Sequence, residues 1–308
     1  MRVRATVVAV SGALALSALA VPAAQAAGSG SHHPVDTFRA RHEAASGGSA
    51  LAGARSAAGA PYRLDARFGS VRINRGRAIV AGTGGKVTVP VTFRITHGAG
   101  VDLTAEDVEL DLVLYRGASF AHPDHVLIGD FRPTCDTASA TVASCTGTID
   151  VSPSDELGDV DATVWKAAGY VTDWNDVDPG SDDVDWTKVG YAEGDGLATV
   201  RLQRSARLTV DAAPEPVRKG RTLTVTGALT RADWDADRYA RYSGQAVRLQ
   251  FRKKGSSTYS TVKTVRSSAT GGLKTTVKAS VDGYYRFVFA GSSTTAAVSA
   301  AGDFVDVR

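Results

Sequence analysis

The sequence predicts an all-β protein that contains two β-sandwiches in tandem, and three observations support this prediction. Short segments alternate apolar and polar residues, as strands with one buried face do. Turns such as Gly-Ser, Gly-Gly and Asp-Gly separate most of these segments. In the C-terminal part, where the pattern is clearest, no segment carries the 3.6-residue apolar period of a helix.

Residues 1–26 have the order of a secretory signal peptide. The basic "MRVR" precedes an apolar run from Ala5 to about Val21, and small residues make an A-x-A site that ends at Ala26. We expect cleavage after Ala26 and a secreted, extracellular protein with no transmembrane segment in the mature chain. An N-terminal membrane anchor is the alternative. Residues 27–61 are rich in Ala, Gly and Ser, and this composition predicts a flexible leader.

Charge divides the remaining chain into two parts. Residues 62–204 hold 22 acidic and 13 basic side chains, a net charge of −9. Residues 205–308 hold 8 acidic and 17 basic side chains, a net charge of +9. We therefore expect an acidic domain over residues 62–204 and a basic domain over residues 205–308.

The basic domain has the clearest strand pattern. In "RTLTVTGAL" the apolar Leu223 and Val225 alternate with threonines, and in "QAVRLQFRKKG" the apolar Val247, Leu249 and Phe251 alternate with Arg248, Gln250 and Arg252. In "GLKTTVKAS" the residues 273, 275 and 277 point to one face and Lys274, Thr276 and Lys278 to the other. With "RLTVD", "YSTVKTV", "YYRFVFA" and "DFVDV", about seven strands fall within about 100 residues. This number of alternating strands in this length predicts an immunoglobulin-like β-sandwich.

The acidic domain repeats the theme less regularly. "KVTVPVTFRIT", "DVELDLVLYRG", "HVLIGDF", "CTGTIDV", "ATVWKAAGYV" and "LATVRLQR" all have strand patterns. Two weak internal echoes indicate duplication: "VELDLVLYRG" resembles "VRLQFRKKG", and "TDWND" resembles "ADWDA". We therefore predict two tandem immunoglobulin-like sandwiches after the signal peptide and the leader.

The run from "SGQAVRLQFRKKG" through "GYYRFVFAG" to "AAGDFVDVR" resembles the C-terminal immunoglobulin-like domain of secreted proteins from high-GC Gram-positive bacteria. The resemblance covers about residues 206–308. It implies the fold, a bacterial source and an exported location, and such domains serve as spacers or binding modules. It implies no catalytic residues.

Cys135 and Cys145 are separated by nine residues. In an exported protein a disulfide between them is the expected state. Neither cysteine belongs to a C-x-x-C pair or has a neighbouring His, so the sequence gives no sign of redox chemistry.

The segment "TDWNDVDPGSDDVDW" is the strongest candidate for a metal site. Carboxylate and amide oxygens are the ligands that calcium prefers, and a Pro-Gly turn would fold the loop around an ion. The EF-hand spacing is absent, so a solvated hairpin loop is the alternative. The candidate calcium ligands are Asp173, Asn175, Asp176, Asp178, Asp182, Asp183 and Asp185. No cofactor is required by the sequence.

Other residues suggest ligand binding. Trp174, Trp186 and Trp234 lie in Asp-rich loops, where exposed rings could stack on sugars; packing onto apolar surface is the alternative. His122 and His125, with Asp124 and Asp130, form a weaker zinc hypothesis.

Outward-facing cations such as Arg248, Arg252, Lys274 and Lys278 could attract an anionic wall polymer, or they keep the sheets soluble. Export and the lack of a recognition helix argue against nucleic acid.

The sequence lacks the G-x-S-x-G, H-E-x-x-H, P-loop and dinucleotide-binding motifs. We therefore expect a secreted, non-catalytic protein that binds or separates components of the extracellular space or cell envelope, with wall polymer or extracellular glycan as partner. The second hypothesis is a carbohydrate-binding module that uses calcium, and the third is a glycan hydrolase. The oligomeric state is left open.

Overall fold

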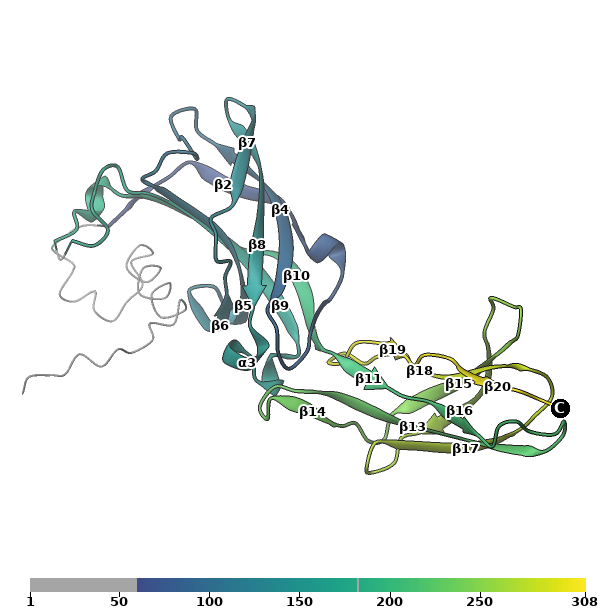
Figure 1. Ribbon diagram of the computed structural model, residues 1–308. Coiled ribbons are helices and arrows are strands. Elements are labelled where there is room, and N and C mark those ends of the chain that lie inside the picture. The colour runs from purple at the N-terminus through teal and green to yellow at the C-terminus, as the bar shows by residue number, and fades with distance from the viewer. Residues whose placement is uncertain (1–59, 182) are drawn as a thin grey trace, which may run out of the picture. The chain divides into compact units, whose positions relative to one another are not determined.

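The computed structural model describes residues 60–308 apart from residue 182 (Figure 1). The predicted signal peptide and all of the predicted leader except residues 60 and 61 lie outside the described residues. In residues 60–308 the helical elements are short: α3 (Pro153–Glu156), η1 (Asn74–Gly76), η2 (Asp159–Asp161) and η3 (Trp186–Lys188). None of these is long and apolar enough to cross a bilayer.

Two antiparallel sheets form the first sandwich. One has the strand order β2-β4-β8-β7, and the other has the order β1-β10-β9-β5-β6, in which β1 and the added β3 pair with β10 in parallel. The strands are β1 (Tyr62–Arg63), β2 (Ala66–Ile73), β3 (Ile79–Ala81), β4 (Val87–His97), β5 (Val108–Ser119), β6 (His122–Leu127), β7 (Thr134–Ser139), β8 (Val142–Val151), β9 (Val164–Asp173) and β10 (Gly190–Arg204).

The second sandwich also has two sheets. In one, β13 pairs with β11, β12, β14 and β17; in the other, the order is β16-β15-β18, with β19 and β20 added to β18. The strands are β11 (Ala206–Leu208), β12 (Asp211–Ala213), β13 (Thr222–Asp233), β14 (Arg238–Arg241), β15 (Ala246–Lys253), β16 (Ser260–Arg266), β17 (Gly272–Lys278), β18 (Gly283–Phe289), β19 (Val298–Ser299) and β20 (Asp303–Val305).

These strand orders confirm the predicted fold class. In the first sandwich, β2, β4, β8 and β7 take the places of strands A, B, E and D of an immunoglobulin domain, and β10, β9, β5 and β6 those of G, F, C and C′. In the second, β13 and β17 occupy places B and E, opposite β16, β15 and β18 at C′, C and F. The protein is all-β and consists of immunoglobulin-like sandwiches.

Alternation explains how β4 and β18 are oriented. Val89, Val91, Phe93 and Ile95 of β4 are buried in the first core, and the Thr and Arg side chains between them are outside it. Strand β18 follows the same rule in the second core, where Tyr285, Phe287 and Phe289 are buried. The apolar period of two therefore decides which face of these two strands meets the core.

One of the two internal echoes corresponds to equivalent strands. The "VELDLVLYRG" of β5 and the "VRLQFRKKG" of β15 both occupy place C of their sandwiches. The two Asp-Trp segments do not correspond, because Trp174 follows β9 at place F and Trp234 follows β13 at place B. The second echo is therefore coincidental.

Strand β10 passes directly into β11 with only Ser205 between them. The Ser205 N–H donates to the carbonyl oxygen of Ala81 at 2.8 Å, and the Ala232 N–H donates to that of Ser205 at 2.8 Å. Ala232 and Trp234 pack in the core of the first sandwich, although they follow residue 205 in sequence. The first core thus includes side chains from beyond the boundary that charge predicted.

The structure joins Cys135 and Cys145 in a disulfide, as the sequence predicts. The two residues face each other in the β7–β8 hairpin, and Cys145 is buried against the first core. The bond therefore holds one hairpin of a single sheet together and does not join the two sheets.

Replacing both cysteines by Ser should lower the free energy of unfolding by about 2–3 kcal/mol, because the bridge restricts the unfolded chain. Urea unfolding under non-reducing conditions measures this. Wild-type protein with reductant is the control and should match the variant. Equal unfolding midpoints for the oxidised wild type and the variant would contradict the prediction.

A fragment of residues 205–308 should fold alone, since about 100 residues suffice for a sandwich core. Trp234 is its only tryptophan, and without the first core its fluorescence should have the long-wavelength emission of a solvated indole. Cooperative unfolding followed by circular dichroism is expected. A disordered fragment would show that the second sandwich depends on the first.

Candidate functional site

The acidic loop between β9 and β10 uses several of its carboxylates as turn acceptors. Asp173, Asp178 and Asp185 each accept a hydrogen bond from the backbone N–H two residues further on, at 3.2, 2.8 and 3.2 Å. The Asp185 carboxylate also accepts from the Thr187 hydroxyl at 2.6 Å, and these bonds lower its pKa. These aspartates therefore stabilise the loop itself.

The remaining calcium candidates are distributed along the same loop. The Asn175 side-chain amide donates to the Tyr62 hydroxyl and to the carbonyl oxygen of Lys188 at 2.9 and 2.8 Å. Asp176 and Asp183 are exposed, and Asp182 lies outside the described residues. Among the residues that the structure describes, no group of three or more His, Cys, Asp or Glu side chains is placed to hold a metal ion. Calcium binding by this loop stays a prediction.

The three loop tryptophans are buried, which corrects the sugar-platform hypothesis. Trp174 and Trp186 are 7% and 9% exposed, and their rings pack against each other with centroids 5.9 Å apart. They form a small apolar cluster with Val189 beneath the acidic loop. Trp234 is 4% exposed, and its indole N–H donates to the carbonyl oxygen of Gly82 at 2.6 Å. Rings covered in this way offer no face to a sugar.

A buried network of charges surrounds Asp161 in the first sandwich. Its carboxylate accepts hydrogen bonds from Arg116 Nε and the Gly158 N–H, both at 2.8 Å, and lies 3.2 Å from His125 Nδ1. Burial alone raises the pKa of Asp161, but the hydrogen bonds with His125 and Gly158 bring it below its usual range. The network joins η2 to β5 and β6, so its role is structural.

The same pairings leave little support for zinc. Asp124 pairs with Arg116 at 3.3 Å, and Asp130 pairs with Lys86. His125 already contacts Asp161. The carboxylates of the zinc hypothesis are thus each neutralised by a separate cation.

Asp111 on β5 is the carboxyl group most altered by its surroundings. It is 8% exposed, and burial raises its pKa to about 7, although the Leu112 N–H donates to it at 2.7 Å. The neighbouring charge of Glu109 contributes to this rise. A raised pKa is typical of an acid catalyst, but Asp111 does not line the cavities beside Cys135, Val262 or Tyr62.

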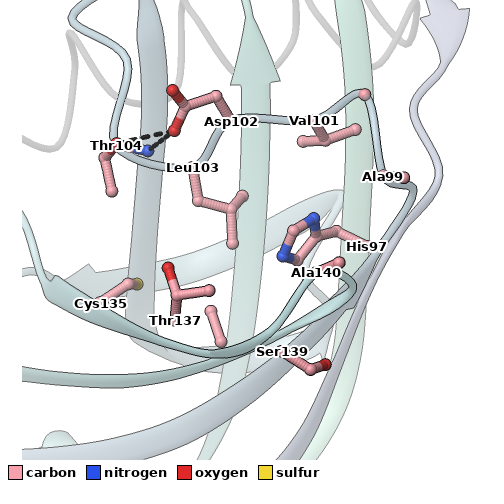
Figure 2. Close-up of a pocket in the computed structure, with 12 residues that line it drawn as sticks. His97, Ala99, Val101, Asp102, Leu103, Thr104, Cys135, Thr137, Ser139 and Ala140 are labelled. Carbon is pink, nitrogen blue, oxygen red and sulfur yellow. Dashed lines mark hydrogen bonds between the residues drawn. The ribbon is translucent and has the colours of Figure 1, made fainter.

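A cavity of about 240 Å³ lies beside the disulfide (Figure 2). Its rim includes Asp102, whose carboxylate accepts hydrogen bonds from the Thr104 N–H and hydroxyl at 2.9 and 2.7 Å. His97 also lines the cavity, and the Nδ1 of its imidazole lies 3.0 Å from the carbonyl oxygen of Gly98. The Asp102 carboxylate is thus already hydrogen-bonded to Thr104. The other lining side chains are mostly small and offer few polar groups that could recognise a ligand.

The outer face of the β16-β15-β18 sheet carries cations and aromatic rings side by side. Arg252, Tyr259, Tyr284 and Arg286 form this surface, which we name the arginine–tyrosine face. All four residues are half-buried. The sequence indicated Arg252 but missed the other three; the outward positions of "GYYRFVF" were the signal for Tyr284 and Arg286.

No protein-family model matches the chain, and no curated protein matches it. Similar solved structures include the Yersinia pseudotuberculosis adhesin InvE, at 12% identity over 78% of this chain and 58% of that chain, with a TM-score of 0.24. The N-terminal eight immunoglobulin domains of Down Syndrome Cell Adhesion Molecule match at 11% identity over 80% and 25% of the two chains, with a TM-score of 0.33. A titin I-band fragment matches at 10% identity over 79% and 65%, with a TM-score of 0.31.

The chain spans less than two thirds of the length of each of these three structures. At such low identities and TM-scores the likeness supports no functional argument. The fold assignment rests on the strand order described above.

The calcium hypothesis predicts that millimolar calcium raises the melting temperature, because an ion that binds the folded state alone stabilises it. The double variant Asp176→Ala/Asp178→Ala should lose that gain. Melting curves of both proteins, with calcium and with chelator, measure it. A wild-type midpoint that does not respond to calcium would leave the loop as solvated surface.

The raised pKa of Asp111 predicts a pH-dependent stability. Its folded pKa of about 7 exceeds the ordinary value of 3.8, so the folded state holds the proton more tightly than the unfolded state. The free energy of unfolding should therefore fall as pH rises from about 4 to about 7 and level off above that.

Asp111→Asn should remove this dependence and stabilise the protein by up to about 4 kcal/mol at pH 8, with little effect at pH 3. Urea unfolding across the pH range measures it. Glu109→Gln is the control and should have a smaller effect. Parallel pH profiles of Asp111→Asn and wild type would refute the assignment.

Proposed function

We propose that this protein is a secreted, non-catalytic binding or spacer protein of the extracellular space or cell envelope of a high-GC Gram-positive bacterium. Its partner is a cell-wall polymer or an extracellular glycan. The signal-peptide pattern, the disulfide and the tandem immunoglobulin-like sandwiches support an extracellular role.

The arginine–tyrosine face is the observation that carries the binding role. It places two arginines and two aromatic rings together on an accessible sheet surface. Arg116 and Arg204 of the first sandwich, in contrast, pair with aspartates that hold the fold together. A surface of this composition suits recognition, because arginines and aromatic residues contribute most of the energy in binding interfaces.

A glycan hydrolase needs a raised-pKa acid opposite a second carboxylate across a cleft. Asp111 supplies the raised pKa, so hydrolysis is the function that the experiment must separate from binding.

The test is incubation of the exported protein with purified cell walls of a high-GC Gram-positive host. We expect the protein to sediment with the walls without releasing reducing sugars, and its N-terminus to begin at Ala27. Release of reducing sugars that Asp111→Asn abolishes would replace binding by hydrolysis. Protein that neither sediments nor hydrolyses would contradict both functions.

A further inference from the structure

Strand register brings the arginine–tyrosine face together. Arg252 of β15 lies opposite Tyr284 of β18, and Gln250 lies opposite Arg286. Tyr284 in turn lies opposite Phe304 of β20, with ring centroids 5.1 Å apart. Side chains opposite each other on neighbouring strands share one face of the sheet, so this surface is continuous across three strands.

Aromatic rings hold both guanidinium groups in place. The Arg252 guanidinium carbon lies 4.1 Å from the Tyr284 ring centroid and 5.3 Å from that of Tyr259. The Arg286 guanidinium carbon lies 3.7 Å from the Tyr259 centroid. Stacking of this kind orders a side chain that is otherwise mobile, so less entropy is lost when it binds an anion.

Neither arginine pairs with a carboxylate among the described residues. Arg252 Nη1 donates to the carbonyl oxygen of Ser256 at 2.6 Å, and Arg286 Nε donates to the side-chain oxygen of Gln250 at 2.9 Å. A guanidinium has five N–H donors, so each arginine keeps donors beyond these bonds for an external anion. The net charge of +9 over residues 205–308 favours an anionic partner.

The chemistry narrows the class of that partner. One exposed ion pair contributes little free energy of binding. A ligand with repeated charges can contact both ordered arginines at once and should therefore bind more tightly than a ligand with one charge. Half-buried tyrosine rings add apolar contact for the carbon face of a sugar. We propose that the arginine–tyrosine face binds a linear acidic polysaccharide, with the arginines contacting its anionic groups and the tyrosines contacting its sugar rings.

This inference rests on the proposed extracellular binding function and adds the ligand class and the residues. Polygalacturonate, a carboxylated polysaccharide, is the probe for calorimetric titration of the full chain. Dextran lacks the charge, and polyglutamate and polyphosphate lack the sugar. We expect polygalacturonate to bind, dextran not to bind, and the two sugar-free polyanions to bind at least several-fold more weakly.

The decisive variant is Arg252→Gln/Arg286→Gln, which should weaken polygalacturonate binding about tenfold, as loss of charge-assisted hydrogen bonds implies. Lys274→Gln/Lys278→Gln on β17 removes the same charge from the other sheet and is the matched control. It should weaken binding at most two- to threefold. Arg252→Lys/Arg286→Lys keeps the charge and loses the planar fork, and it should give an intermediate loss.

Melting temperatures establish that each variant is folded. Equal loss in the two Gln double variants would show attraction by net charge alone and overturn the site. Equal affinity for polyglutamate, or no affinity for polygalacturonate, would overturn the ligand class. Wall binding that survives Arg252→Gln/Arg286→Gln would refute this inference and leave the proposed function intact.

Discussion

The contacts made by the last residue of β10 are the constraint on which the junction between the two sandwiches depends. Arg204 is the last residue of this strand, is 5% exposed, and pairs with Asp159. Its backbone N–H donates to the carbonyl oxygen of Thr294 at 2.9 Å, and its own carbonyl oxygen accepts from the Ala296 N–H at 2.9 Å. Removal of the partner of a buried cation is strongly destabilising, so the pair with Asp159 holds the end of the strand to η2. The two backbone bonds hold it to residues of the second sandwich.

Asp159 extends the same junction. Its carboxylate accepts from the Trp234 N–H at 3.0 Å, and its own N–H donates to Asp235 at 3.0 Å. Trp234 then fills part of the first core. Asp235 and Trp234 of "ADWDA", which in sequence suggest a ligand loop, are used here to join the two parts of the chain.

The two sandwiches use charge differently. In the first, several acidic side chains pair with cations or accept backbone hydrogen bonds, as Asp161, Asp130 and Asp185 do. In the second, Arg252 and Arg286 stack on aromatic rings, and neither has a carboxylate partner among the residues that the structure describes. These acidic side chains therefore stabilise the first sandwich, whereas the two arginines of the second are the ones that we propose for recognition.

The sequence by itself determined the fold class, the pairing of Cys135 with Cys145, and core-facing residues of the second sandwich such as Leu223, Val225, Val247 and Leu249. These properties depend on local alternation and on short separations along the chain, which are visible without coordinates. Tertiary structure alone decided that Trp174, Trp186 and Trp234 are buried and that Tyr284 and Arg286 lie beside Arg252. Burial and cross-strand contact depend on which distant strands pair and in what register, and no local pattern specifies that.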